Sequence, residues 1–339
     1  MRAFLKKYGS ILYIALMSAA VVLFFALSGD LKEIGEALAG MDPVWLCAAA
    51  GCMLLYISLR TAVLVYYLRR RGHRIGARKA FGVSGAGFFY SAITPSASGG
   101  QPAQVLRLVR GGVPAGTATA AISIEFIGFQ VGFLLLGAAA WIFGHGYLSA
   151  RIAGFGWLVI LGYALNAGTI ALIVLAAASP KALSRLLSGL FHIGAKLRWV
   201  KDEEKAIAKV TRTLEEYRSA MFSLLEHIAD LLAVLALSLA EVTAYMLVPY
   251  CVYRAFALSG STVFQVTGTE LMLFIASAFI PLPGAAGASE SGFCLFFRGI
   301  FTQETVVPAM FAWRFLTYYF TLIVGFALMS LDDLTRNIK

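Results

Sequence analysis

The chain has 339 residues, of which 60% are hydrophobic and 14% are charged, and its formal net charge is +10. Soluble domains carry roughly 25% charged residues, so this composition excludes an ordinary soluble protein and indicates an integral membrane protein. The basic residues mostly flank apolar segments, as they do in the cytoplasmic loops of membrane proteins. The positive charge therefore indicates an orientation in the membrane, and no nucleic-acid partner is expected.

Six apolar segments are long enough to cross a bilayer, which takes roughly 20 mainly apolar residues in a helix. The first segment follows Arg2, Lys6 and Lys7 and could pass for a signal peptide. It is long for such a peptide and its cleavage site is poor, so we expect an uncleaved span. The predicted spans are 11–27, 44–68, 116–143, 152–178, 228–253 and 306–331.

Two further apolar segments, 81–110 and 263–300, are interrupted near their centres. The interruptions read TPSASGGQP at 94–102 and PLPGAAGASE at 281–290. Proline and glycine at this density end a helix, and open backbone at membrane depth is tolerated only inside protein or beside a polar cavity. We expect each segment to be a re-entrant helical hairpin; two full crossings each would leave the flanking topology unchanged.

Basic residues set the predicted orientation, because cytoplasmic loops are enriched in Lys and Arg. The N-terminus, the loop at 69–79 and the segment 180–227 are basic, whereas the loop at 28–43 is acidic. We expect a multi-pass cell-membrane protein with both termini in the cytoplasm. The segment 180–227 is predicted to be a cytoplasmic amphipathic insertion on the membrane surface.

The two halves of the chain share one plan: two spans, an interrupted hairpin and one more span. Pro95-x-Ala97-x-Gly99 in the first hairpin also parallels Pro283-x-Ala285-x-Gly287 in the second. We expect membrane repeat 1 at 1–143, with its hairpin at 81–110, and repeat 2 at 144–339, with its hairpin at 263–300. The predicted fold is an all-α, inverted-repeat membrane bundle of about six full spans plus two hairpins, or about eight helical membrane segments.

The residue types at the interruptions suit an anion site. Ser96 and Ser98 are typical helix N-caps, and Pro102 suits the first turn of the helix that follows. Gly99 and Gly100 would let a ligand approach the backbone closely, and helix N-termini favour anions. Ser289 similarly opens the helix that carries Glu290. The alternative is that small residues only allow close helix packing.

Ionisable residues inside apolar spans point to function by default. Glu125 and Arg314 follow the two interruptions at nearly equal spacing, so we expect them to share a central cavity as a pair, with Glu290 nearby. The alternative is a purely structural ion pair. Arg60 is expected to reach toward the cytoplasmic surface, and Glu241 has no evident partner.

Gln130 and Asn166 are also polar residues within spans. Amide side chains in such positions commonly form hydrogen bonds between helices. We expect this role for both, and no contact with substrate.

At both interruptions and in the helices after them, the chain resembles the flippase-like membrane domain of lysylphosphatidylglycerol synthases. The resemblance covers most of the chain from Phe81 onward. It implies translocation of lipid between leaflets and no lysyl transfer, because the soluble synthase domain is absent from this sequence. The matching elements are 94–102 through Arg107, the acidic Glu125, Pro283-Gly284 with Gly287 and Glu290, and Trp313-Arg314-Phe315 followed by Thr317-Tyr318-Tyr319.

Two positions depart from the family pattern. Gln104 stands where family members often have Arg, and Phe126 follows Glu125 where they have an acidic-Arg pair. Both differences remove positive charge near the expected headgroup site, so the family's substrate does not carry over to this chain.

These observations together predict a lipid flippase or translocase for an anionic-headgroup lipid, either a phospholipid or a polyprenyl-phosphate-linked lipid. The chain contains no nucleophile–base set or metal-ligand spacing, so we expect neither an enzyme nor a cofactor. Membrane lipids are the expected partners, and a lipid-synthesising enzyme is a further candidate. The alternatives are a non-transporting scaffold for lipid-modifying enzymes and a secondary transporter of a soluble organic anion. The predicted substrate-binding residues are Thr94, Pro95, Ser96, Ser98, Gly99, Gly100, Gln101, Glu125, Pro283, Gly284, Gly287, Ser289, Glu290 and Arg314.

Overall fold

The computed structural model describes residues 31–151, 156–179, 203–277, 280, 285 and 287–336. The predicted first span at 11–27, and the predicted site residues Pro283 and Gly284, lie outside these residues. The described helices are α2 (Leu31–Ala39), α3 (Pro43–Arg70), α4 (Ala77–Ile93), η1 (Pro95–Ala97), α5 (Gly100–Arg110), α6 (Ala115–Arg151), α7 (Gly156–Ala178), α9 (Glu203–Phe222), α10 (Ile228–Met246), α11 (Val248–Ala255), α12 (Val263–Ser277), α13 (Ala288–Phe296), α14 (Val306–Arg314), the π-helical segment η3 (Phe315–Phe320) and α15 (Thr321–Arg336).

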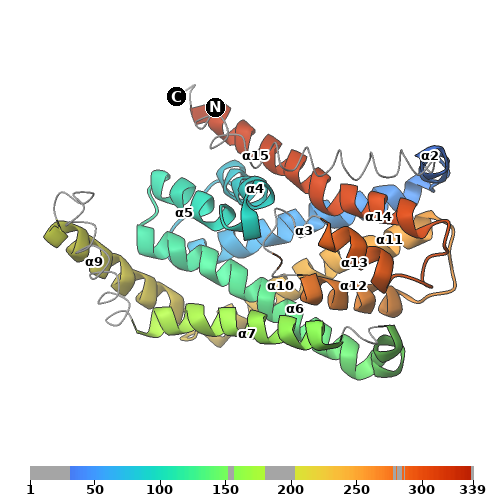
Figure 1. The fold of residues 1–339 in the computed structure, drawn as a ribbon. Coiled ribbons are helices and arrows are strands. Elements are labelled where there is room, and N and C mark those ends of the chain that lie inside the picture. The colour runs from blue at the N-terminus through green and yellow to red at the C-terminus, as the bar shows by residue number, and fades with distance from the viewer. Residues whose placement is uncertain are drawn as a thin grey trace.

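Five helices are long and apolar enough to cross a membrane, judged by length and composition. They correspond to all the predicted spans except the first. The prediction of an all-helical membrane bundle therefore holds in the described part of the chain (Figure 1). The five helices are Pro43–Arg70, Ala115–Ser149, Gly156–Ala178, Ile228–Ala255 and Val306–Leu334.

The boundaries of these helices have local causes. α3 begins with Pro43, and the Asp42 carboxylate caps it by accepting a hydrogen bond from the Val44 N–H at 2.8 Å. Both are typical helix-start features. The helix 228–255 is divided into α10 and α11 at Leu247, two residues before Pro249, because proline has no N–H for the helical hydrogen-bond ladder.

Hydrogen bonds join one set of helix ends, which we call the basic end. There the Tyr67 hydroxyl at the end of α3 donates to the Ala220 carbonyl of α9. Arg70 of α3 pairs with Asp230 at the start of α10 at 2.8 Å. Arg107 near the end of α5 pairs with Asp332 of α15 at 2.9 Å. The Arg78 guanidinium also donates to the Leu331 carbonyl of α15 at 3.1 Å, so the basic loop at 69–79 and the ends of α5 and α15 lie together.

The interrupted segment 81–110 forms a hairpin of two packed helices, α4 and α5. The Lys79 ammonium at the start of α4 donates to the Gly111 carbonyl just after α5, at 2.8 Å. Farther along, Gly87 of α4 lies against the Gln104 side chain of α5. The segment thus leaves the basic end and returns to it, as both the re-entrant hairpin and two full crossings would require.

The segment 263–300 has the same plan at the opposite end of the bundle. The Leu273 side chain of α12 lies against Gly292 of α13. Beyond α13, the Phe301 ring packs edge-on against Tyr253 of α11, with ring centroids 5.6 Å apart. The two arms therefore also return to the end from which they came, and the two hairpins point toward each other.

The amphipathic insertion predicted at 180–227 is described only from Glu203 onward. Its described part, α9, is a helix that packs against α6. The Glu216 carboxylate accepts a hydrogen bond from the Gly116 N–H at 2.9 Å, and the Tyr217 hydroxyl donates to Ser123 at 3.2 Å. Between α6 and α7, Gln130 and Asn166 share a hydrogen bond, which confirms their predicted interhelical role.

Close approach of backbones explains the packing of α4 on α15. A Cβ atom added at Gly85 would lie 2.6 Å from the Gly325 carbonyl oxygen, and one at Gly325 would lie 2.9 Å from the Gly85 carbonyl oxygen. Neither backbone can shift without disturbing its own helix. Small residues at a helix crossing permit this contact in membrane proteins.

We expect Gly325→Ala to lower the free energy of unfolding by about 1–3 kcal/mol, the usual cost of overpacking a tight contact. Gly51→Ala in α3 is the matched control, because Gly51 has nothing within 4 Å of an added Cβ. The control should be neutral or should stabilise by about 0.5–1 kcal/mol through helix propensity. Denaturation of both purified variants in detergent measures the difference. Equal stability of the two variants would contradict this account of the α4–α15 contact.

Candidate functional site

Thr94 organises the first interruption. α4 ends before Thr94, because the residue before a proline is disfavoured in the helical conformation, and Pro95 follows. The Thr94 hydroxyl accepts a hydrogen bond from the Gly99 N–H at 2.9 Å. The expected capping by Ser96 and Ser98 is wrong, since the N-cap of α5 is Gly99, which has no side chain to make a capping bond. Threonine five residues upstream supplies the acceptor instead.

Left-handed backbone recurs at corresponding positions of the two interruptions. Ala97 has φ 54° and Ala285 has φ 50°, and Ser96 also has a positive φ of 51°. Non-glycine residues rarely adopt this conformation, and such strain clusters at functional sites. Hydroxyls support both turns: Ser91 donates to the Ala97 carbonyl at 3.4 Å and Ser289 to the Ala285 carbonyl at 3.2 Å. The sequence parallel between the interruptions therefore extends to their backbone geometry.

The glycines of the first interruption have a packing reason. A Cβ at Gly99 would lie 2.7 Å from the Thr94 methyl carbon, and one at Gly100 would overlap the Ser91 side chain and the Gly87 carbonyl. These glycines allow α5 to pack closely on α4, as the packing alternative predicts. A side chain at either position would therefore disturb the hairpin itself.

Glu290 connects the second interruption to α14. Its carboxylate accepts a hydrogen bond from the Gly287 N–H at 2.7 Å and thereby caps α13. The same carboxylate pairs with the Arg314 guanidinium at 2.8 Å. Arg314 also stacks on the Tyr318 ring, 4.3 Å from its centroid. One acidic side chain thus positions both the start of α13 and the cation at the end of α14.

A cavity of about 320 Å³ lies where the two hairpins approach each other. Both interruptions contribute to its wall, and Ser96 and Ala97 are exposed, so the cavity reaches the protein surface. The π-helical segment η3 follows Arg314 directly and adds Thr317 and Tyr318. Such segments occur frequently at functional sites. The lining residues are Tyr56, Phe88, Ser91, Ala92, Ser96, Ala97, Phe129, Tyr245, Glu270, Leu273, Phe274, Ser277, Ile280, Ala285, Ser289, Trp313, Arg314, Thr317, Tyr318 and Thr321.

The predicted site residues occupy different positions relative to this cavity. Three of them line it: Ser96, Ser289 and Arg314. Glu290 contacts it indirectly through Arg314. Thr94, Gly99 and Gly100 build the turn between α4 and α5, Pro95, Ser98 and Gln101 are exposed on or beside that turn, and Gly287 caps α13.

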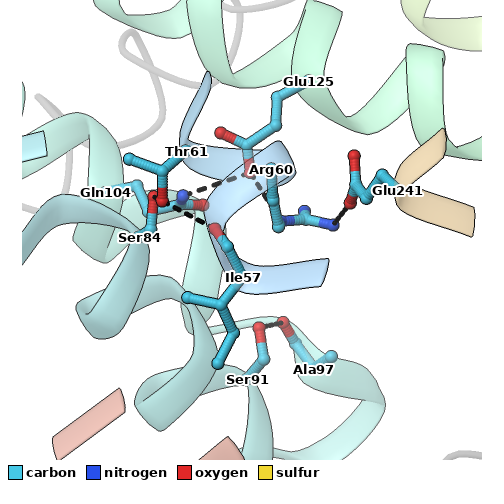
Figure 2. Close-up of polar contacts among 9 residues, drawn as sticks. All are labelled: Ile57, Arg60, Thr61, Ser84, Ser91, Ala97, Gln104, Glu125 and Glu241. Carbon is cyan, nitrogen blue, oxygen red and sulfur yellow. Dashed lines mark hydrogen bonds and ion pairs between the residues drawn. The ribbon is translucent and has the colours of Figure 1, made fainter. Parts of the chain in front are cut away.

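A second charged cluster lies beside the cavity and centres on Arg60 (Figure 2). Arg60 of α3 pairs with Glu125 of α6 at 2.7 Å and with Glu241 of α10 at 3.1 Å. The guanidinium also stacks between the rings of Phe88 and Phe129, which line the cavity. One cation thus joins three helices.

This cluster corrects two expectations. Arg60 does not extend to the membrane surface: ten residues of α3 separate it from Arg70, or about 15 Å at 1.5 Å per residue, which is beyond the reach of its side chain. The expected Glu125–Arg314 pair is also absent, because Glu125 pairs with Arg60 and Arg314 pairs with Glu290. Glu241, which had no evident partner in the sequence, lies on the other side of Arg60.

Gln104 also belongs to the Arg60 cluster. Its amide donates to the Glu125 carboxylate at 3.3 Å, and its side chain is buried between α4 and α5. One of the two positions at which the sequence departs from the family pattern is therefore in direct contact with a buried acid (Figure 2).

Glu270 is a cavity residue that was not predicted from the sequence. It is fully buried on α12, and its carboxylate accepts a hydrogen bond from the Trp313 indole at 3.2 Å. The rule that selected Glu125 applies equally here, since Glu270 is an acid within an apolar segment. It was overlooked because it lies in the interrupted segment 263–300 but outside the motif at 281–290.

The Arg60 cluster supports a sharp stability test. Arg60→Gln leaves two buried carboxylates without their cation and should cost about 3–5 kcal/mol, whereas Glu125→Gln or Glu241→Gln leaves Arg60 one carboxylate partner and should cost less. In a double-mutant cycle, the effects of Glu125→Gln and Glu241→Gln should be non-additive because both residues share Arg60. Thermal unfolding in detergent measures each variant. Additive effects would show that the two acids act independently.

Comparison with known proteins agrees with this architecture. The chain is 23% identical to a protein named "UPF0104 membrane protein" from Archaeoglobus fulgidus over 283 residues, which cover 79% of each chain. The family model described as "Lysylphosphatidylglycerol synthase TM region" matches residues 10–325. The match includes both interrupted hairpins, the Arg60 cluster and Arg314. This chain therefore belongs to the family of the lysylphosphatidylglycerol synthase transmembrane region, and it is a multi-pass membrane protein.

Proposed function

We propose that this protein moves a lipid with an anionic headgroup between the two leaflets of the cell membrane. The observation that carries the proposal is the cavity between the two interrupted hairpins, with Arg314 on its wall. The hairpins come from opposite ends of the bundle. A movement of either half of the protein would therefore open or close the site that lies between them. In this proposal, residues 1–143 and 144–339 act as inverted repeats that rock about the site.

The size of the cavity suits a headgroup. Pockets for small ligands have volumes of about 300–1,000 Å³, and this cavity lies at the lower limit at about 320 Å³. It has room for a phosphate-bearing headgroup and none for two acyl chains. The chains would therefore stay in the lipid while the headgroup crosses inside the protein.

The residues beside the cavity favour a lipid over a water-soluble anion. Tyr90 precedes the lining residue Ser91, and Phe315 follows Arg314, and both aromatic side chains are exposed. Exposed aromatic and apolar side chains next to a polar cavity are suited to contact with acyl chains. In this proposal the acyl chains lie against these side chains while the headgroup occupies the cavity.

Arg314 would recognise the headgroup by exchanging partners. In the structure it pairs with Glu290, and a phosphate is a strong acceptor for a guanidinium. Ser96 and Ser289 add hydroxyls to the same cavity wall. A phosphate that binds Arg314 would weaken its hold on Glu290 and thus couple headgroup binding to the start of α13.

The transport proposal is tested with purified protein in phosphatidylcholine vesicles that contain a trace of fluorescent phosphatidylglycerol. The protein should speed leaflet exchange of this lipid, and Arg314→Gln should slow it by at least about tenfold, since a hydrogen bond to a charged group contributes about 1.5–3 kcal/mol. Arg254→Gln is the matched control, because Arg254 stacks on Trp45 away from the cavity. No acceleration by the unmodified protein would reject the proposal.

The double variant Arg314→Gln/Glu290→Gln separates recognition from folding. In this double variant both partners of the ion pair are neutral, so no buried charge is left unpaired. If Arg314 and Glu290 only support the fold, lipid exchange should therefore recover from the loss seen in Arg314→Gln. A role in binding phosphate predicts that exchange of phosphatidylglycerol stays slow while the protein remains folded. Exchange of neutral diacylglycerol should respond weakly to either variant.

The proposed orientation places the basic end and both termini in the cytoplasm. With the native cysteines replaced, cysteines introduced at Gly76 and Arg110, at the two feet of the first hairpin, should react from the cytoplasmic side with an impermeant thiol reagent. A cysteine at Gly260, in the loop between α11 and α12, should react from outside. Labelling of positions 76 and 110 from opposite sides would mean that the segment crosses the membrane fully.

A further inference from the structure

Glu270 is an incompletely neutralised acid in the wall of the cavity. The residue has no exposed surface, and one carboxylate oxygen accepts a hydrogen bond from the neutral Trp313 indole at 3.2 Å. The other oxygen, Oε2, is buried and has no hydrogen-bond partner among the residues that the structure describes. A negative charge in such surroundings is strongly disfavoured unless a bound cation neutralises it.

The groups around Glu270 do not supply that cation. Among the described lining residues, the charged side chains are Glu270 and Arg314, and Arg314 is held by Glu290 at 2.8 Å. Tyr245 of α10 and Tyr56 of α3 line the same cavity as Glu270, and their ring centroids are 5.2 Å apart. Both phenols are neutral acids that cannot balance a negative charge.

Charge balance links Glu270 to the headgroup. The site consists here of Arg314, Glu290 and Glu270. Arg314 and Glu290 together are neutral, so an ionised Glu270 gives the site a net charge of −1. An anionic headgroup would make this charge −2. With a proton on Glu270, the site is neutral before the headgroup binds. The anion can then use Arg314 without facing a second negative charge across a cavity of about 320 Å³.

We propose that Glu270 binds a proton that crosses the membrane together with the anionic headgroup, so that lipid and proton move as an electroneutral pair. The inference rests on the proposed transport of an anionic lipid. The proton enters from water on one side, bonds to Glu270 and leaves to water on the other side when the headgroup is released. No other bond forms or breaks.

The local chemistry favours a proton over a metal ion. Metal ions that prefer oxygen ligands take several of them. The described residues contain no group of three or more His, Cys, Asp or Glu side chains placed to hold a metal ion. A proton needs only the Oε2 lone pair.

The test uses the full chain in phosphatidylcholine vesicles with a trace of fluorescent phosphatidylglycerol. This headgroup is a phosphodiester that keeps its single negative charge between pH 5 and pH 8, so any dependence on pH comes from the protein. A difference of one pH unit across the membrane should shift the leaflet distribution of the lipid by up to about tenfold. A potassium diffusion potential of 100 mV should shift it little, whereas an anion that moved alone would be shifted by about 50-fold.

Glu270→Gln should reverse these responses, because the amide is neutral and cannot release a proton. Transport by this variant should respond to the potential and lose its response to the pH difference. A residue that only supports the fold would change the rate without exchanging one driving force for the other. Glu304→Gln is the matched control, since Glu304 is exposed in the loop after α13, and it should behave like the unmodified protein.

Each outcome has one meaning. If the unmodified protein accelerates phosphatidylglycerol exchange but responds to voltage and not to pH, the proton inference is overturned while lipid transport stands. A response to a sodium gradient in place of a pH difference would also overturn it. If there is no accelerated exchange at any pH, the proposed function itself fails. Should Glu270→Gln not fold, the responses of the unmodified protein to pH and voltage still decide between these outcomes.

Discussion

Neutralisation of buried charge is the constraint on which this structure depends. A charge in an apolar interior is strongly disfavoured unless a partner lies within contact distance. Arg60 meets this condition through carboxylates on two other helices, and Arg314 meets it through Glu290. Because each partner lies on a different element, these pairs also fix how α3, α6 and α10, and α13 and α14, lie against one another.

The same requirement applies to the open backbone of the two interruptions. Helix ends leave N–H groups without intrahelical partners, and in this bundle side chains from nearby positions supply acceptors. The Thr94 hydroxyl serves Gly99, and the Glu290 carboxylate serves Gly287. These two hydrogen bonds satisfy backbone N–H groups at the starts of α5 and α13 inside the bundle. The cavity exists because two such turns, from hairpins of opposite direction, approach each other there.

Glu270 differs from the other buried acids in this respect. Glu125 and Glu241 share a guanidinium, whereas Glu270 has one neutral donor and lines the cavity. The proposed coupling of a proton to an anionic headgroup follows from this difference. The Arg60 cluster would hold the scaffold in place, and the Arg314–Glu290 pair and Glu270 would change partners during transport.

The sequence by itself determined the features that depend on local composition. Apolar length sets which helices can span a bilayer, and proline and glycine set where a helix must stop, so the spans and both interruptions were predictable from 44 onward. Which charged residues pair was decided only by the tertiary structure. Arg60 and Glu241 are 181 residues apart, and no local pattern relates α3 to α10. Gly99 and Gly100 likewise looked open to ligand, until the approach of α4 to α5 filled the space beside them. Helix boundaries follow from interactions within a few residues, whereas ion pairs and cavities depend on how distant helices pack.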